Sequence, residues 1–294
     1  MRFSLIVATY GRSEVLYDLF ESLCKQTFKD FEVIIVDQNA SNEVELIVSG
    51  FTGILNIVYL KTPLKGLSRA RNIGINHSKG EILSFPDDDC VYPDFLLQRV
   101  NEKFNTDTLL EFCSGKALDV ISGNPLEMKW ARKKTEITFG NIFNTVISIS
   151  IFVKKRVVVP FDEEFGAGAK YGSAEESDFV INLLKNKAKG IYFPDEINPL
   201  HPSNKINGFS QIIRSKNITY ALGLGAFFRK HASLFFYTGL IKVFVLSMLI
   251  RPLGGIILGI IRIQTDLVKI SSINLRYRWI GFFNYKKKNE NIGC

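Results

Sequence analysis

The first 90 residues alternate strand-like apolar runs with segments of helical periodicity. Between the first two runs, apolar residues recur at helical spacing from Val15 to Leu23. Strands that alternate with helices predict an α/β fold in which helices flank a mostly parallel sheet on both faces. The four runs with the length and apolar content of buried strands are residues 3–9, 31–37, 55–61 and 81–85.

Polar residues stand where these predicted strands end. Thr9 and Asp37 close the first two strands, and three consecutive acids, Asp87, Asp88 and Asp89, follow the fourth. Ligands of open parallel sheets bind outside the carboxyl ends of the strands. Two carboxylates about 4 Å apart repel by about 4 kcal/mol at an effective dielectric of about 20, so the triplet calls for a compensating charge. A divalent cation is one candidate, and a solvated acidic turn is the alternative.

Cysteine and histidine usage narrows the class of protein. The chain has four cysteines, none in a CxxC pair, and only three histidines, which argues against a zinc site and against a disulfide framework. We therefore expect a reducing, cytoplasmic setting. Met1 and Arg2 lead directly into the first apolar strand, a pattern that predicts no signal peptide.

The net charge of +8 is concentrated near the C-terminus. Residues 227–294 contain 11 Lys or Arg and two acids, so residues 1–226 carry a net charge of −1. A basic surface spread over the whole protein is therefore not expected, which argues against general nucleic-acid binding.

The last quarter of the chain is strongly apolar but interrupted by charge. Its longest uncharged runs are eight residues (243–250) and ten residues (252–261), whereas a membrane-spanning helix needs about 20. Pro252 and the following glycine pair are expected to bend a helix here, which favours two short segments that lie in the membrane interface. The alternative is a pair of amphipathic helices packed on the catalytic domain or on a dimer partner.

We accordingly predict two domains: a catalytic domain at residues 1–220 and a basic, apolar, membrane-associated helical tail at residues 221–294. The tail would hold the protein peripherally on the cytoplasmic face of the cell membrane. Cations such as Lys286, Lys287 and Lys288 would meet the anionic membrane surface at about 1 kcal/mol each.

Five motifs in this order resemble those of the family-2 glycosyltransferases, which have the GT-A nucleotide-diphospho-sugar-binding fold. The resemblance covers about residues 1–205, and its motifs are SLIVATYGR, VIIVDQNAS, GLSRARNIGI, EILSFPDDDC and GSAEESDF. It implies transfer of a sugar from a nucleotide-diphosphate sugar, usually with inversion and with Mg²⁺ or Mn²⁺. The tail resembles bacterial relatives that build O-antigen, capsule or exopolysaccharide, whose acceptors are commonly glycans on polyprenyl diphosphate carriers.

The resemblance also assigns roles to single residues. It places Asp87–Asp89 at the DxD motif, where a cation joins the carboxylates to the donor diphosphate, with Asp89 as the preferred direct ligand and Asp87 as a second. Many relatives carry a further acid where this chain has Cys90. The residues that it implies for donor binding are Thr9, Tyr10, Asp37, Arg71, Asn72, Asp87 and Asp88.

Inverting transfer needs a general base to accept the proton of the acceptor hydroxyl. The AEESDF segment resembles the family's Glu-Asp motif, with Glu176 where Asp is more usual, so Glu176 is the first candidate. Glu175 is the second, and Asp178 is a further acid of the same segment. The alternative is that these acids have no catalytic role and only stabilise the first turn of a helix. The resemblance also makes His201 a candidate ligand for metal or phosphate.

Competing functions lack their motifs. A sugar nucleotidyltransferase should carry a Gly-rich loop with a Lys after the first strand, and a dinucleotide-dependent oxidoreductase should carry G-x-G-x-x-G there. The segment ATYGRSEV contains neither. A membrane-associated scaffold that has lost catalysis is a third alternative, against which the retained acids at 87–89 and 175–176 argue.

Overall fold

The computed structural model describes residues 1–203 and 209–286. The chain forms two compact units. The first comprises Met1–Glu163 and Glu176–Asn204, and the second comprises Glu164–Glu175 and Lys205–Cys294. This division differs from the predicted boundary after residue 220, because helix α7 (Gln211–Lys230) packs against α11 (Thr265–Asn284) and groups with the tail helices.

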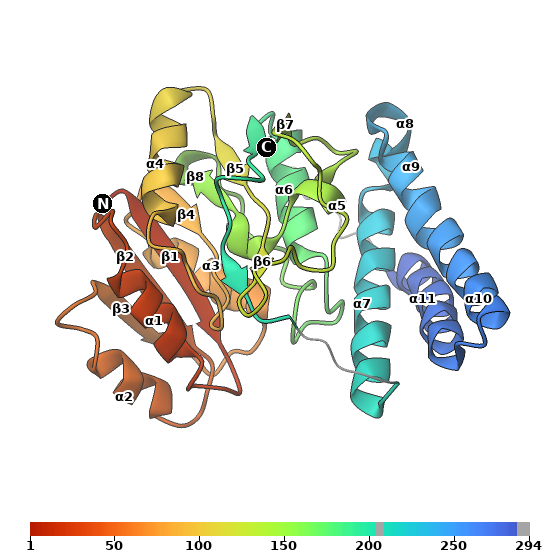
Figure 1. The fold of residues 1–294 in the computed structure, drawn as a ribbon, viewed down its shortest axis with the longest axis horizontal. Coiled ribbons are helices and arrows are strands. Elements are labelled where there is room, and N and C mark those ends of the chain that lie inside the picture. Colours follow the sequence, from red (N-terminus) through yellow and green to blue (C-terminus); the bar gives the residue numbers. More distant parts are fainter. Residues whose placement is uncertain (204–208, 287–294) are drawn as a thin grey trace. The chain divides into compact units, whose positions relative to one another are not determined.

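The described residues of the first unit form an eight-stranded sheet (Figure 1). The four strands nearest one edge, β3, β2, β1 and β4, are all parallel, which confirms the predicted mostly parallel α/β architecture. Strand β8 is antiparallel to both of its neighbours, β4 and β5. In spatial order the strands are β3 (Ile57–Lys61), β2 (Phe31–Asp37), β1 (Phe3–Thr9), β4 (Ile82–Ser84), β8 (Phe152–Lys154), β5 (Phe112–Ser114), β9 (Gly190–Tyr192) and β7 (Thr135–Glu136).

Helices follow most of the strands in this unit. The amphipathic helix predicted between the first two strands is α1. Its apolar face is buried, because the leucines at 16, 19 and 23 have no exposed surface. The helices that follow or precede strands are α1 (Leu16–Cys24), α2 (Glu43–Ser49), α3 (Leu67–His77), α4 (Leu96–Thr106), α5 (Ile142–Thr145) and α6 (Glu175–Lys185).

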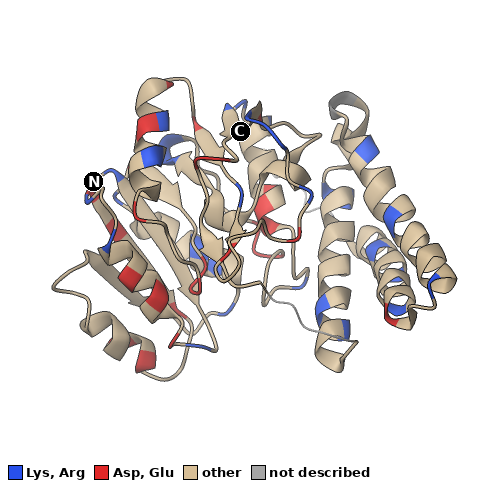
Figure 2. Cartoon of the chain, viewed as in Figure 1, with Lys and Arg blue, Asp and Glu red and all other residues tan. Residues whose placement is uncertain are grey.

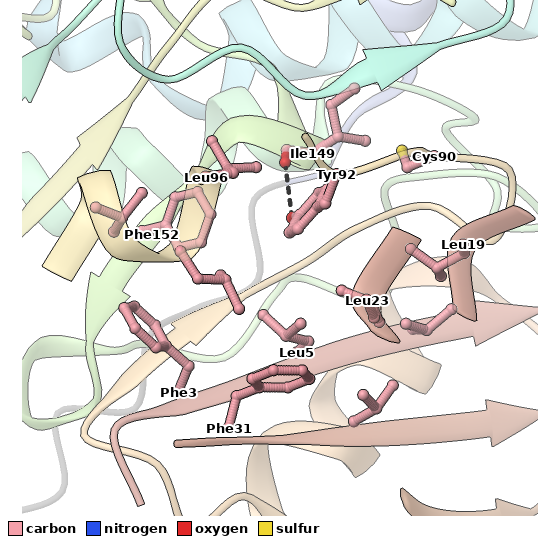
Figure 3. Packing of buried hydrophobic residues seen from close by; sticks show 14 of the residues in the cluster. Phe3, Leu5, Leu19, Leu23, Phe31, Cys90, Tyr92, Leu96, Ile149 and Phe152 are labelled. Atoms are coloured by element: carbon pink, nitrogen blue, oxygen red, sulfur yellow. Dashed lines mark hydrogen bonds between the residues drawn. The ribbon is translucent and has the colours of Figure 1, made fainter. Parts of the chain in front are cut away.

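The main core lies between the sheet and its helices (Figure 3). Phe3 on β1 and Phe152 on β8 pack edge to face, with ring centroids 6.2 Å apart. The one polar group in this region that Figure 3 draws with a partner is the Tyr92 hydroxyl, which donates to the Ile149 carbonyl at 3.0 Å. A buried hydroxyl needs such a partner, because leaving it without one costs about 1–3 kcal/mol.

A second, two-stranded sheet brings a distant histidine to the edge of the main sheet. Strand β10 (Leu200–His201) pairs in parallel with β6 (Leu118–Asp119), so that His201 lies opposite Asp119. Leu200 also exchanges two backbone hydrogen bonds with Val91, at 2.8 and 2.9 Å. Since Val91 follows the acidic triplet by two residues, this pairing fixes His201 next to the triplet.

The second unit is helical. Residues Leu240–Ile261 form one continuous 22-residue helix with a mean hydropathy of 2.1, long and apolar enough by length and composition to cross a membrane. Only 22% of its apolar window is buried. The prediction that Pro252 divides this segment into two short helices is therefore wrong. The described helices of this unit are α7, α8 (Phe235–Thr238), α9 (Leu240–Val245), α10 (Arg251–Ile261) and α11.

A π-helical turn explains why Pro252 does not break this helix. Residues Leu246–Ile250 form that turn between α9 and α10, and the Arg251 amide donates to the Leu246 carbonyl, five residues back. In the same register the Ser247 carbonyl would pair with residue 252, which is a proline without an N–H. Nη1 of Arg278, on α11, donates to the Ser247 carbonyl instead. A residue 31 positions away thus supplies the missing donor.

Candidate active site

The acidic triplet lies at the carboxyl edge of the parallel strands, as predicted. Asp87 forms a parallel bridge with Ala8, next to the end of β1, and the end of β1 is in register with the end of β2. Asp88 and Asp89 are only 4% and 9% exposed. The solvated-turn alternative is therefore wrong, because two of the three carboxylates are buried.

Arg12 neutralises the two buried acids. Its Nη2 lies 2.6 Å from Oδ1 of Asp88, and its Nη1 lies 2.6 Å from Oδ2 of Asp89. Burial raises the pKa of Asp88 even though Arg12 opposes this shift. The sequence reading did not single out Arg12. The available signal was its position in the loop after β1, where Gly11 turns the chain with a φ of 79°.

His201 completes an acidic and imidazole cluster. Its Nε2 lies 3.2 Å from Oδ1 of Asp89 and 3.9 Å from Oδ2 of Asp87. Burial opposes protonation of His201, but the hydrogen bond and charge of Asp89 outweigh it and raise the pKa of the imidazole. In turn, burial favours a neutral Asp89, but His201 and Arg12 outweigh it and lower the pKa of that carboxyl.

The donor set of this cluster fits a divalent cation. Ligand atoms of Asp87, Asp89 and His201 all lie within 4.8 Å of one another. The buried Oδ1 of Asp89 and Nε2 of His201 lie 3.2 Å apart, close enough for both atoms to ligate one cation. Two carboxylates and an imidazole suit Mn²⁺, whereas Mg²⁺ prefers oxygen ligands alone.

Arg71 and Asn72 lie side by side on α3 but make different contacts. The Arg71 side chain is 1% exposed, and its Nη2 lies 3.1 Å from Oδ1 of Asp87. Its guanidinium stands over the Phe161 ring at 5.3 Å. The amide of Asn72 donates to the Phe161 carbonyl at 2.9 Å and accepts from the Phe161 N–H at 2.8 Å. Asn72 therefore holds the 161 segment against α3.

A cleft opens beside the ends of β1 and β2. It has a volume of about 580 Å³, and its lining includes Tyr10, Gln38, Asn39, Lys61 and Lys65. Lys65 donates to the Tyr10 hydroxyl at 2.7 Å. The size is that of a small-molecule site.

Two predicted donor-binding residues lie behind this cleft. Asp37 is fully buried; its Oδ1 accepts from the backbone and side-chain N–H groups of Asn39 at 2.8 and 2.9 Å, and its Oδ2 accepts from the Tyr59 hydroxyl at 2.7 Å. Its predicted effect on the donor would therefore be exerted through Asn39, which lines the cleft. Thr9 is 1% exposed, and its hydroxyl donates to the Arg12 carbonyl at 3.0 Å.

The candidate base residues begin helix α6. Glu176 is half-buried, whereas Glu175 and Asp178 are buried, and Oδ2 of Asp178 accepts from the Asn182 amide at 3.3 Å. Phe179 anchors the helix, since its ring stacks on Phe161 with centroids 4.4 Å apart. The same Phe161 ring faces Arg71, so the first turns of α6 and the arginine beside Asp87 share one aromatic support.

Comparison with known proteins identifies the family. The model of the family "Glycosyl transferase family 2" matches residues 4–158, which is more than half of the chain. The chain belongs to this family. Membership makes the protein a glycosyltransferase, and the resemblance drawn from the five sequence motifs is confirmed.

The names of two bacterial relatives each state an undecaprenol-linked acceptor. The UDP-Glc:alpha-D-GlcNAc-diphosphoundecaprenol beta-1,3-glucosyltransferase WfaP of Escherichia coli is 24% identical over 81% of this chain and 94% of its own length. The GalNAc(5)-diNAcBac-PP-undecaprenol beta-1,3-glucosyltransferase of Campylobacter jejuni is 28% identical over 64% of this chain. The match spans only 61% of that protein.

Solved structures of glycosyltransferases share the fold. TarS residues 1–349 of S. aureus, crystallised in complex with UDP-GlcNAc, superposes with a TM-score of 0.61 at 16% identity, over 95% of this chain and 92% of that one. The mannosyltransferase PcManGT from Pyrobaculum calidifontis, in complex with GDP-Man and Mn²⁺, gives 0.64 at 14% identity, over 95% and 87%. These likenesses establish a GT-A fold.

Proposed function

We propose that this enzyme transfers a sugar from a nucleotide-diphosphate sugar to a glycan on a polyprenyl diphosphate carrier, in the synthesis of a bacterial surface polysaccharide. The observation that carries the proposal is the cluster of Asp87, Asp89 and His201 at the carboxyl edge of the sheet, next to the residues that line the 580 Å³ cleft. The undecaprenol-linked acceptors named for two relatives support the acceptor class.

In this proposal Asp87, Asp89 and His201 hold Mg²⁺ or Mn²⁺. When bound, the cation would act as a Lewis acid that neutralises charge on the departing nucleoside diphosphate. Arg12 and Arg71 already contact the triplet. Guanidinium groups bind phosphate oxygens through paired donors, so these two side chains would orient the donor diphosphate.

The donor nucleotide would occupy the cleft at the ends of β1 and β2. Tyr10 and Asn39 line this cleft, and the buried Asp37 fixes Asn39 through two hydrogen bonds. Thr9 supports the loop that carries Arg12. Asn72 would affect the donor only indirectly, because its side-chain N–H and its side-chain oxygen both bind the backbone of Phe161.

Glu176 would accept the proton of the acceptor hydroxyl as that oxygen attacks the anomeric carbon, with inversion. It is the most exposed of the three candidate acids. A base must reach the acceptor, and a residue that is 1% exposed, as Asp178 is, meets this need less well. Asp178 instead accepts a hydrogen bond from Asn182, which lies on the same helix.

The helical unit would keep the enzyme at the cytoplasmic membrane surface, where a lipid-linked acceptor is confined. Figure 2 shows that Lys and Arg outnumber Asp and Glu on α7 to α11. Large apolar side chains such as Ile257, Ile260 and Ile263 are 57–87% exposed there. Apolar groups flanked by cations favour an anionic lipid surface.

The transfer proposal is tested by product formation. Purified enzyme is supplied with a panel of nucleotide sugars and a synthetic undecaprenyl-diphosphate-linked sugar, with Mn²⁺ or with EDTA. We expect a lengthened lipid-linked product with one donor, no product in EDTA, and no product for Asp89→Asn. The matched control is Asp107→Asn, which removes a half-buried carboxylate that pairs with Lys189 at 3.2 Å, away from the triplet. Full activity in EDTA would overturn the metal role, and release of nucleotide without transfer to any lipid-linked sugar would overturn the acceptor class.

The membrane proposal has its own test. Cell fractions are washed with high salt and then with detergent, and an Ile263→Cys variant is probed with a membrane-impermeant thiol reagent from outside the cell. We expect partial release by salt, full release by detergent and no labelling. Recovery of the whole protein in the soluble fraction would refute membrane association, and labelling would show that the helix at residues 240–261 crosses the membrane.

A further inference from the structure

A second cleft lies at the opposite edge of the sheet from the acidic triplet. Its residues precede β1, lead into β4 and end the antiparallel strand β8, so they gather where the parallel strands begin. Its volume is about 580 Å³. The residues that line this basic cleft are Arg2, Lys79, Gly80, Glu81, Ile82, Lys154, Lys155 and Arg156.

Five cations and one acid line the basic cleft. Arg2 pairs with Glu81 at 2.6 Å, and Arg156 pairs with Glu111, outside the lining, at 2.9 Å. The ammonium groups of Lys154 and Lys155 donate to the carbonyls of Thr108 and Ser78, which are neutral.

The positive charge of this cleft is therefore only partly compensated by ion pairs. Lys79, Lys154 and Lys155 have no carboxylate partner within ion-pair distance in the described part of the chain. Burial lowers the pKa of Lys154; the charges of Arg156 and Arg2 act in the same direction, and the charges of Glu111 and Asp107 oppose them. Residues 1–226 carry a net charge of −1, so the crowding is local and does not reflect the composition of the catalytic unit.

We propose that the basic cleft binds a phosphate-bearing anion, either free in solution or on the headgroup of an anionic lipid. Ammonium and guanidinium groups together match the charge and the several acceptor oxygens of a phosphate group. The concave shape and the volume suit a compact ligand. The cleft is distinct from the donor site, because its residues lie at the starts of β1 and β4 and at the end of the antiparallel β8, whereas Thr9 ends β1 and Asp87 follows β4.

Binding of pyrophosphate, measured by calorimetry in EDTA, tests the proposal without a cation at the acidic triplet. The test variant is Lys79→Gln/Lys155→Gln, and the matched control is Lys25→Gln/Lys133→Gln, which removes two exposed lysines of the same unit. All four side chains are exposed, so the fold should persist, and thermal unfolding checks this. Lys79→Gln alone serves as a milder second variant.

We expect the test variant to bind pyrophosphate about 30-fold more weakly than the wild type, which is about 2 kcal/mol for the loss of two cations, and the control to bind like the wild type. A parallel sedimentation assay uses vesicles of equal parts phosphatidylglycerol and phosphatidylcholine. A loss confined to pyrophosphate assigns a free anion, and a loss that extends to the vesicles assigns a lipid headgroup. Equal behaviour of the two double variants in both assays, or no binding of either probe by the wild type, overturns the proposal.

Discussion

Replacing Arg12 by glutamine should weaken the metal-free protein and tighten its hold on a divalent cation. Arg12 contacts Asp88 and Asp89 at 2.6 Å each, and these two carboxylates are buried. Without Arg12 they keep their burial and lose the one guanidinium that contacts both of them. The proposed cation would share Asp89 with Arg12, so the arginine competes with it for negative charge.

The contacts set the size of the effect. Opposite unit charges about 4 Å apart attract by about 4 kcal/mol at an effective dielectric of about 20. Arg12 is 49% exposed, so solvent screens part of this attraction. The expected loss therefore lies between the 0–1 kcal/mol of surface pairs and the roughly 3–5 kcal/mol of buried ones, at about 2 kcal/mol. If more than half of this energy opposes the cation, Mn²⁺ should bind about tenfold more tightly, since each 1.4 kcal/mol or so is a factor of ten.

Urea unfolding of the metal-free protein and titration of Mn²⁺ followed by electron paramagnetic resonance measure the two effects. Arg99→Gln, an exposed position on α4, is the matched control for the loss of one positive charge. Weaker Mn²⁺ binding by Arg12→Gln would refute the reasoning, because it would mean that Arg12 supports the metal site instead of competing with it. Unchanged stability would show that the two contacts contribute nothing to the metal-free protein.

Three further predictions concern the base, the histidine and the tail. Glu176→Gln should lower kcat by about 10²-fold with little change in donor Kd, measured by steady-state kinetics and calorimetry; if only Glu175→Gln does so, the base is Glu175. The pKa of His201 is raised in the folded protein, so its protonation should stabilise metal-free wild type over His201→Gln below about pH 6.5, and the advantage should disappear as pH rises through the raised pKa. Mn²⁺ affinity should change in the opposite direction, rising with pH as the imidazole loses its proton, and a pH-independent affinity would argue against His201 as a ligand. Arg278→Met should leave the Ser247 carbonyl without its donor and lower the unfolding free energy in detergent by about 1–3 kcal/mol, whereas Arg276→Met, an exposed position on the same helix, should not; equal stability of the two variants would contradict this role.

Sequence periodicity was sufficient to predict the parallel half of the sheet and the edge at which the acidic triplet lies. Strands β1 and β2 are continuous apolar runs that end in a polar residue, so their ends could be aligned and the acidic triplet placed at the same edge. The motif order then identified the family. By contrast, β8 and β5 have three residues each, too few to show a period, and the pairing of β8 with β4 and with β5 depends on contacts made across the fold.

The contacts that the sequence did not reveal join residues far apart in the chain. Arg12 meets Asp88 across 76 positions, and Asn72 binds the backbone of Phe161 across 89. The apolar helix of the tail was predicted to break at Pro252, because local rules describe the proline and not the Arg278 side chain that replaces its missing donor. Local propensity does not predict the structure at such positions, because the group that supplies the missing hydrogen bond belongs to another helix or strand.

The insertion of β8 between β4 and β5 bears on the order in which the protein can assemble during synthesis. Strands β3, β2, β1 and β4 are contiguous in space and are complete once residue 84 has been made, so this half of the sheet can form early. The inner edge of β4 then waits for residues 152–154, and the triplet waits for His201, more than 110 residues behind it. Chains released before residue 201 would carry the acidic triplet and Arg12 without the histidine. The nascent enzyme therefore gains its full set of candidate metal ligands only after most of the catalytic unit has left the ribosome.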